Sequence, residues 1–170
     1  MNESFKIILN AIREQYGAAI AMLEQNLKSC PKEVWDERTN GPPFWHVAYH
    51  VMWFLDWYLS ESKEARVSFK SKFGDASSHL EQLNKKPEIA LTSDQLLAYL
   101  KEIKEKAKYR FEHLTSDELI QHSVFEWHGN SVLSSLLYNL RHLMLHTGAL
   151  NLRLRRKGVK LDNWVSHQRI

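Results

Sequence analysis

The stretch that does most to decide this fold runs from residue 136 to residue 146 and reads Leu136-Leu137-Tyr138-Asn139-Leu140-Arg141-His142-Leu143-Met144-Leu145-His146. Its apolar residues recur at the spacing of a helix buried along one side. The pattern extends in both directions, from about Ser131 to Lys157, and Gly158 follows as a residue of the type that ends helices. The sequence therefore predicts a long last helix over these residues.

Two histidines on this helix are the first candidates for chemistry. His142 and His146 are four residues apart and therefore share one face. Their neighbours on a helical wheel are apolar: Leu143, Leu150, Tyr138, Leu145 and Ala149. An unpartnered polar group in such surroundings costs on the order of 2–7 kcal/mol. Because a divalent metal suits two neutral imidazoles at once, we expect the pair to bind one.

Three other segments predict long helices. Residues 5–27 repeat apolar side chains every three or four positions, and Pro31 ends that pattern. Residues 44–59 are apolar almost all round, which is typical of a helix buried on several sides. A third helix begins near Thr92, where Thr92 and Gln95 match a capping box.

The connections between these helices indicate their arrangement. A polar stretch, residues 62–90, separates the second and third helices. Adjacent antiparallel helices usually need only a few linking residues, so this length indicates a crossover to a parallel neighbour. A second capping-box pattern, Thr115 with Glu118, predicts a short helical piece before the last helix. We expect an all-α fold, a four-helix bundle with a long crossover between helices 2 and 3, in a single domain covering residues 1–170.

Composition bounds the class of protein. The chain has 170 residues, of which 44% are hydrophobic and 25% charged, as in ordinary globular domains. The single cysteine, Cys30, excludes an internal disulfide framework and suits a reducing compartment. The N-terminus resembles no secretion signal, and no run of about 18 apolar residues suggests a membrane span. We therefore expect a cytoplasmic protein with no membrane partner.

A third metal ligand must come from another helix. His46 and His50, on the apolar segment 44–59, are the candidates, and the spacing alone does not choose between them. Three imidazoles would leave one coordination position open, which is the catalytic pattern for zinc. Nickel and ferrous iron also accept imidazole, so the metal stays open. Against this stands the ordinary alternative that a buried histidine is a hydrogen-bonded core residue.

Two segments resemble the signature segments of DinB-like proteins. They are Trp45-His46-Val47-Ala48-Tyr49-His50-Val51-Met52-Trp53-Phe54-Leu55-Asp56 and Arg141-His142-Leu143-Met144-Leu145-His146-Thr147-Gly148-Ala149-Leu150-Asn151, and the closing residues 162–165 add to the likeness. The resemblance implies a four-helix bundle with one metal-binding histidine on the second helix and a pair on the fourth. Matched to that pattern, the ligands are His50, His142 and His146. Ala149 departs from it, because relatives often carry glutamine there, which bears on substrate contacts rather than on the metal.

The resemblance also implies a class of reaction. Characterised DinB-like proteins include thiol S-transferases that use low-molecular-weight thiols, and a thiol-dependent isomerase. We therefore expect a metal-dependent thiol S-transferase or a related activity, with a low-molecular-weight thiol and a small-molecule electrophile as substrates. The alternatives are a metal-dependent hydrolase and a non-catalytic, dimeric interaction or stress-response bundle. The family name implies no DNA binding, and the basic residues from Arg153 onward are those expected at a helix C-terminus.

Several other residues have expected roles. Glu126, Asp56 and Tyr49 are expected to be structural hydrogen-bonding residues, and no general base is assigned. His128 could line the entrance to the site, and Cys30, which follows a helix C-terminus, is not expected to be a nucleophile. The aromatic residues Trp53, Phe54, Trp57 and Trp127 are expected in the core. A second apolar stripe on the last helix, or the Trp-rich second helix, is expected to bury surface in a homodimer; the stripe consists of Leu137, Leu140 and Met144.

Overall fold

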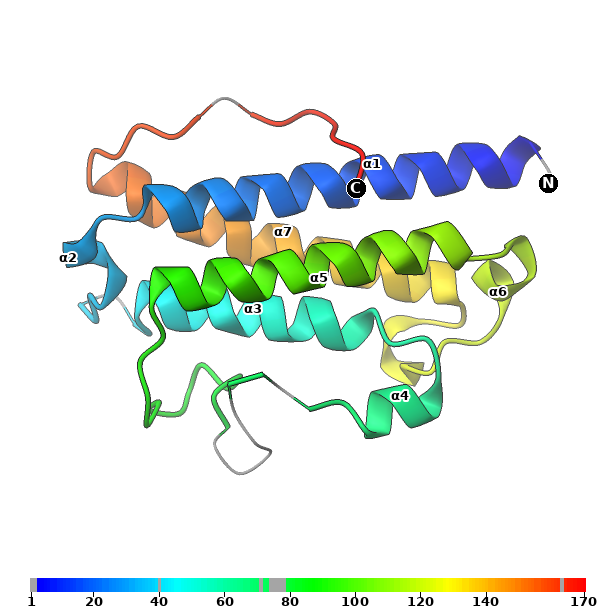
Figure 1. The fold of residues 1–170 in the computed structure, drawn as a ribbon, viewed down its shortest axis with the longest axis horizontal. Coiled ribbons are helices and arrows are strands. Elements are labelled where there is room, and N and C mark those ends of the chain that lie inside the picture. The colour runs from blue at the N-terminus through cyan, green and yellow to red at the C-terminus, as the bar shows by residue number, and fades with distance from the viewer. Residues whose placement is uncertain (1–2, 40, 71, 74–78, 163) are drawn as a thin grey trace.

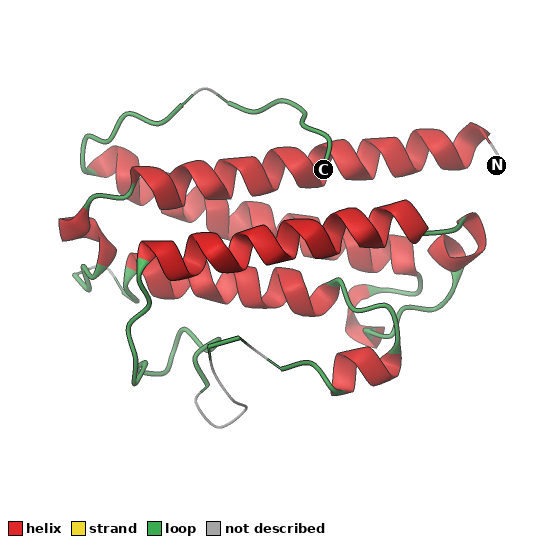
Figure 2. Cartoon of the chain, in the orientation of Figure 1, coloured by secondary structure: helices red, strands yellow, loops and turns green. Residues whose placement is uncertain are grey.

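Four long helices form the body of the protein in the computed structural model, which describes residues 3–39, 41–70, 72–73, 79–162 and 164–170. The long helices are α1 (Glu3–Ser29), α3 (Phe44–Tyr58), α5 (Ser93–His113) and α7 (Val132–Arg156). Short helical pieces lie between them: α2 (Lys32–Trp35), α4 (Lys63–Val67), α6 (Ser116–Ile120) and the 3₁₀ turn η1 (Glu126–His128). Within the described residues every regular element is a helix (Figure 2). The predicted all-α bundle is confirmed.

The order of the helices around the bundle follows from their contacts. α3 and α1 each pack against both α5 and α7. α3 and α5 run in the same direction, joined by the long connection that returns along the bundle, and α1 and α7 both run in the opposite direction (Figure 1). The long segment between the second and third long helices is therefore the crossover to a parallel neighbour that its length predicted.

Helix ends follow the local signals in the sequence. Thr92 and Gln95 form a reciprocal capping box at the start of α5, as predicted. Thr115 caps α6 by accepting from the Glu118 amide, but the Glu118 side chain instead pairs with Arg110. Gly158, with φ of +77°, follows the end of α7.

The core lies between the four long helices and is rich in aromatic side chains. Trp45, Tyr16 and Tyr49 are fully buried in it. Buried polar groups connect helices across it: the Tyr16 hydroxyl donates to the Leu136 carbonyl at 2.7 Å. Such a bond contributes about 0.5–1.5 kcal/mol and fixes the α1–α7 register.

The segment after α7 runs back over the bundle to α1, where the chain ends (Figure 1). Its Gln168 amide donates to the Glu14 carbonyl at 3.3 Å. Gly17 allows this approach, because a Cβ at that position would lie 1.7 Å from the Gln168 carbonyl oxygen. Asn163, part of the closing segment of the family pattern, lies outside the described residues. No helix among the described residues is long and apolar enough to cross a bilayer.

Candidate metal centre

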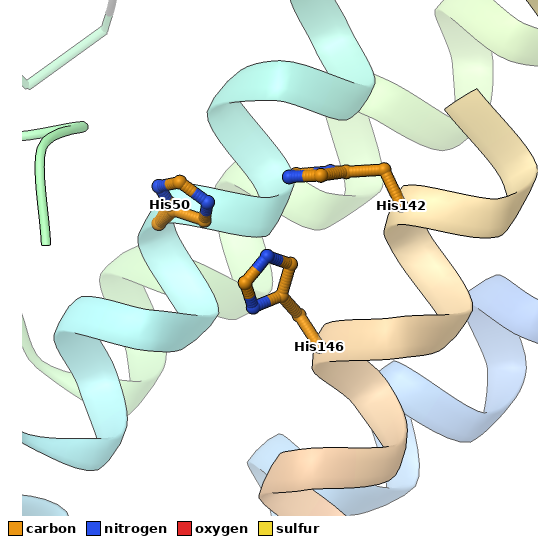
Figure 3. Close-up of side chains that lie close together, drawn as sticks. All are labelled: His50, His142 and His146. Carbon is orange, nitrogen blue, oxygen red and sulfur yellow. The ribbon is translucent and has the colours of Figure 1, made fainter. Parts of the chain in front are cut away.

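Three histidines meet where α3 packs against α7. His50 comes from α3, and His142 and His146 come from successive turns of α7 (Figure 3). The ring centroids of His50 lie 5.3 Å from His142 and 4.6 Å from His146, and those of His142 and His146 are 4.6 Å apart. One ring nitrogen from each lies within 4.8 Å of the others, so the group could hold a metal ion. We call these three residues the histidine triad.

The outer nitrogen of His50 is held by the backbone of the crossover. His50 Nδ1 lies 2.6 Å from the Glu81 carbonyl oxygen. A carbonyl oxygen can only accept, so Nδ1 carries the hydrogen and Nε2 keeps its lone pair. This is the arrangement typical of metal-binding histidines, in which the nitrogen away from the metal donates to a carbonyl or carboxylate.

All three imidazoles are neutral near pH 7. Burial, with the neighbouring His146 and His50 rings, lowers the pKa of His142 to about 3. Burial and His50 lower the pKa of His146 to about 4. Burial also lowers the pKa of His50, although its bond to Glu81 opposes the shift. Neutral imidazoles are the form that binds metal, so the triad needs no loss of protons to accept a dication.

The donor set fits a transition-metal ion. His142 Nδ1 is buried and has no hydrogen-bond partner in the described part of the chain, a situation that costs about 1–3 kcal/mol for a buried polar group. An ion bound through Nδ1 of His142 would give this nitrogen the partner it lacks. Three imidazoles suit zinc, nickel and iron(II), whereas magnesium and calcium prefer oxygen ligands.

Comparison with known proteins agrees with this geometry. A family model of the DinB superfamily matches residues 15–150, which include α3, α7 and the whole triad. The chain belongs to the DinB superfamily. Its members commonly bind metal. No curated protein and no solved structure matched the chain.

The triad of this DinB-superfamily protein lies nearer the surface than the helical wheel predicted. Leu145 is 68% exposed and Ala149 is also exposed, although both were expected in a buried apolar arc. The three histidines are only partly buried. The wheel identified the apolar residues but not which of them a neighbouring helix covers. The triad therefore lies at the α3–α7 interface with each of its three side chains partly exposed.

Aromatic rings line one side of the triad. The Phe54 ring lies 4.8 Å from that of His50 and 5.2 Å from that of His142. Trp53, Phe54 and Trp57 are partly buried, which agrees only in part with the core expected for them. Trp127 is 55% exposed and packs on Trp57, with ring centroids 6.0 Å apart, so its assignment to the core was wrong.

His46 is near the triad in sequence but has a different role. It is buried, with 1% of its surface exposed, and its Nε2 lies 2.7 Å from the Leu80 carbonyl oxygen. His46 is absent from the group of nitrogens that could share an ion. The choice that spacing left open between His46 and His50 thus favours His50, in agreement with the family pattern.

The other polar residues near the signature segments are Asp56, Tyr49 and Glu126. Asp56 accepts from the Tyr99 hydroxyl at 2.7 Å and pairs with Lys106 at 2.6 Å. Tyr49 is fully buried, and Glu126 is exposed on η1. In the described part of the chain no carboxylate joins the triad. Asp56 thus has the structural hydrogen-bonding role expected for it. Tyr49 packs against the Phe73 and Tyr99 rings, and the hydrogen-bonding roles expected for Tyr49 and Glu126 stay predictions.

Neither His128 nor Cys30 belongs to the histidine triad. His128 is buried, hydrogen-bonded to Ser135 at 2.8 Å and stacked on Tyr138 with ring centroids 3.9 Å apart. The expectation that it lines the entrance to the site was therefore wrong. Burial raises the pKa of the Cys30 thiol to about 12, which agrees with the expectation that it is no nucleophile.

The contact between His50 and the Glu81 carbonyl could not be predicted from the sequence. It involves a backbone carbonyl of the crossover, and no residue type encodes such an acceptor. The length of the crossover indicated only that the connection returns along the bundle, and not which helix it contacts.

Proposed function

We propose that this protein is a metal-dependent enzyme in which His50, His142 and His146 bind one divalent ion. The observation that carries the proposal is the convergence of three neutral imidazoles, with ring nitrogens within 4.8 Å of one another, from two packed helices. Zinc, nickel and iron(II) are the candidates on ligand chemistry.

An open coordination position is the second support. The triad supplies three protein ligands, its members are partly buried, and no carboxylate of the described residues joins them. Structural zinc sites have four protein ligands, whereas catalytic sites have three and leave a position for water or substrate. A divalent ion held in this way lowers the pKa of a bound water or thiol and so supplies a nucleophile at neutral pH.

The protein's own residues would orient and shield this chemistry. His50 is oriented from behind by the Glu81 carbonyl, and Phe54 packs against two members of the triad. With Asp56 engaged by Tyr99 and Lys106, no carboxylate of the described signature segments is free to act as a general base. We therefore favour a thiol as the nucleophile, since it ionises far more readily than water and depends less on a base.

The reaction that we favour is thiol S-transfer. The sulfur of a low-molecular-weight thiol would form a bond to an electrophilic carbon while the bond from that carbon to its leaving group breaks and the leaving group takes the electron pair. The thiol proton would pass to the leaving group or to solvent. The partly exposed aromatic side chains beside the triad, Trp53, Phe54 and Trp57, favour an electrophile with an apolar part. A metal-dependent hydrolase would use the same centre with water in place of the thiol.

The first test of this function is metal content, measured by mass spectrometry on untagged protein purified without chelators. We expect about one equivalent per chain in the wild type and a loss in His50→Ala and in His142→Ala. His113→Ala removes an exposed imidazole whose Nδ1 is hydrogen-bonded to the Tyr109 carbonyl of its own helix, and this variant should retain the metal. A wild type that takes up no zinc, nickel or iron(II) would leave the non-catalytic bundle as the better account.

The second test separates the reactions. Loaded protein is mixed with an alkylating electrophile and a panel of low-molecular-weight thiols, and the rate is compared with and without each thiol. Thiol-dependent consumption that is lost in His142→Ala supports S-transfer. Ester or amide hydrolysis that needs no thiol supports the hydrolase.

We also propose that the protein forms a homodimer through α7. Leu137, Leu145 and Leu152 are each about half exposed or more on this helix, whereas Leu140 and Met144 pack partly against the core. The surface that a partner would cover thus differs in part from the stripe expected from sequence. Analytical ultracentrifugation at micromolar concentration tests it, and a monomer would count against this pairing.

A further inference from the structure

A short turn of the crossover, residues 79–82, lies directly against α3. The backbone amide of Gln82 donates to the His79 carbonyl at 2.9 Å, which closes the turn. Leu80 is buried, with 2% of its surface exposed. At this turn the backbone of the crossover contacts side chains of α3. We call residues 79–82 the crossover turn.

Two imidazoles of α3 hold consecutive carbonyls of this turn. His46 Nε2 lies 2.7 Å from the Leu80 carbonyl oxygen, and His50 Nδ1 lies 2.6 Å from the Glu81 carbonyl oxygen. Residues 46 and 50 are one helical turn apart, so the two rings project from one face of α3. Two adjacent carbonyls of the crossover turn thus accept hydrogen bonds from two side chains of one helix.

The acceptors determine the tautomer of both rings. Carbonyl oxygens cannot donate, so His46 carries its hydrogen on Nε2 and His50 carries its hydrogen on Nδ1. The opposite nitrogen of His46, Nδ1, is buried without a hydrogen-bond partner among the described residues. The bond to Leu80 is therefore the polar contact that anchors the His46 ring. The opposite nitrogen of His50, Nε2, faces the other two histidines of the triad (Figure 3).

We propose that His46 is a positioning residue for the metal centre: it holds the crossover turn so that the Glu81 carbonyl keeps His50 as the Nδ1–H tautomer with Nε2 presented to the ion. This inference rests on the proposed function, since it assigns a role toward the same centre. His46 does not bind the ion; it acts through the crossover turn and His50. Partners that orient a metal-binding histidine typically change metal affinity by about 10–100-fold when they are removed.

The affinity test compares three variants in competition with a zinc chelator of known strength. His46→Leu removes the donor and should weaken zinc binding by about tenfold or more. His46→Gln retains an N–H donor and should recover part of the affinity. Tyr16→Phe loses a buried hydrogen bond to the Leu136 carbonyl, outside the crossover, and should bind zinc as the wild type does. It controls for a general loss of stability.

The tautomer test needs no metal. Long-range proton–nitrogen NMR on protein with labelled histidine distinguishes Nδ1–H from Nε2–H rings. In metal-free wild type we expect His50 as Nδ1–H and His46 as Nε2–H, and in His46→Leu the His50 signal should shift toward Nε2–H. A merely structural His46 would leave the His50 tautomer unchanged.

The coupling is reciprocal by linkage. If the closed crossover turn raises zinc affinity by some factor, zinc must stabilise the closed turn by the same factor. Hydrogen exchange at the Gln82 amide, which is bonded to His79, should therefore slow when zinc is added to the wild type. In His46→Leu the amide should exchange faster than in the wild type.

The outcomes separate this proposal from the proposed function. A wild type that binds zinc with an affinity unchanged in His46→Leu overturns the positioning role and leaves the proposed function standing. A wild type that binds no metal contradicts the proposed function, and the metal-free tautomer measurement still decides whether the turn orients His50. An Nε2–H tautomer for His50 in the wild type overturns the positioning role directly.

Discussion

Metal binding by the triad should appear as a large rise in thermal stability. The perturbation is zinc added to metal-free wild type, with His146→Ala as the matched variant that lacks one ligand. The unfolded chain holds no preformed site, because the triad joins residues 50, 142 and 146 from distant parts of the sequence. Zinc therefore binds the folded state in preference, and the binding free energy adds to the free energy of unfolding.

The size of the rise follows from the length of the chain. Free zinc at about 1,000 times its dissociation constant stabilises the folded state by about 4.1 kcal/mol. Unfolding entropies of about 2.1 cal/mol/K per residue give about 0.36 kcal/mol/K for 170 residues. The expected rise in Tm is thus about 11 °C at that excess of zinc.

Differential scanning calorimetry at pH 7.5 measures the rise over a series of zinc concentrations. His146→Ala should show little change, and His113→Ala, which removes an exposed imidazole outside the triad, should respond as the wild type does. The pH lies well above the lowered pKa of each triad histidine, so protons do not compete. An equal rise in Tm in wild type and His146→Ala would mean that the zinc binds elsewhere on the chain and not at the triad.

Three further results are expected. The free energy of unfolding of metal-free protein should fall as the pH drops below about 6.5. The cause is that the unfolded chain then binds a proton at His142, whereas burial lowers the pKa of this residue to about 3 in the folded protein. Urea titrations at pH 7, 6 and 5 measure this fall, and a free energy of unfolding that does not change with pH would contradict it. Gly17→Ala should displace the C-terminal segment, because the new Cβ would lie 1.7 Å from the Gln168 carbonyl oxygen, and carboxypeptidase should then remove that segment faster. The matched variant is Gly148→Ala, whose Cβ meets nothing within 4 Å and which should instead stabilise α7 by about 0.5–1 kcal/mol. Cys30 should react with iodoacetamide at pH 8 far more slowly than free cysteine, because its thiol pKa is raised to about 12, and rapid labelling of folded protein would contradict its burial.

Much of the fold could be predicted because it depends on local signals. The capping box at Thr92 and the glycine after α7 mark helix ends through backbone hydrogen bonds within a few residues. The length of the crossover was enough to indicate parallel α3 and α5, since a short connection cannot return along a bundle. These features need no knowledge of distant contacts.

The site was predictable only in part for the opposite reason. The i, i+4 spacing of His142 and His146 places them on one face, but choosing His50 over His46 required the family pattern, because both lie on an apolar helix. Which apolar side chains stay exposed, such as Leu145 and Trp127, depends on where neighbouring elements end. The Glu81 carbonyl could not be predicted at all, since it depends on the path of the crossover over α3.

We propose that three imidazoles hold an ion whose remaining coordination position is open. X-ray absorption spectroscopy at the zinc edge, on wild type loaded with one equivalent, tests it most directly. We expect three imidazole nitrogens at about 2.0–2.1 Å from the zinc and at least one further oxygen or nitrogen ligand that is not imidazole. A sulfur ligand, four imidazoles, or a spectrum unchanged in His50→Ala would contradict it.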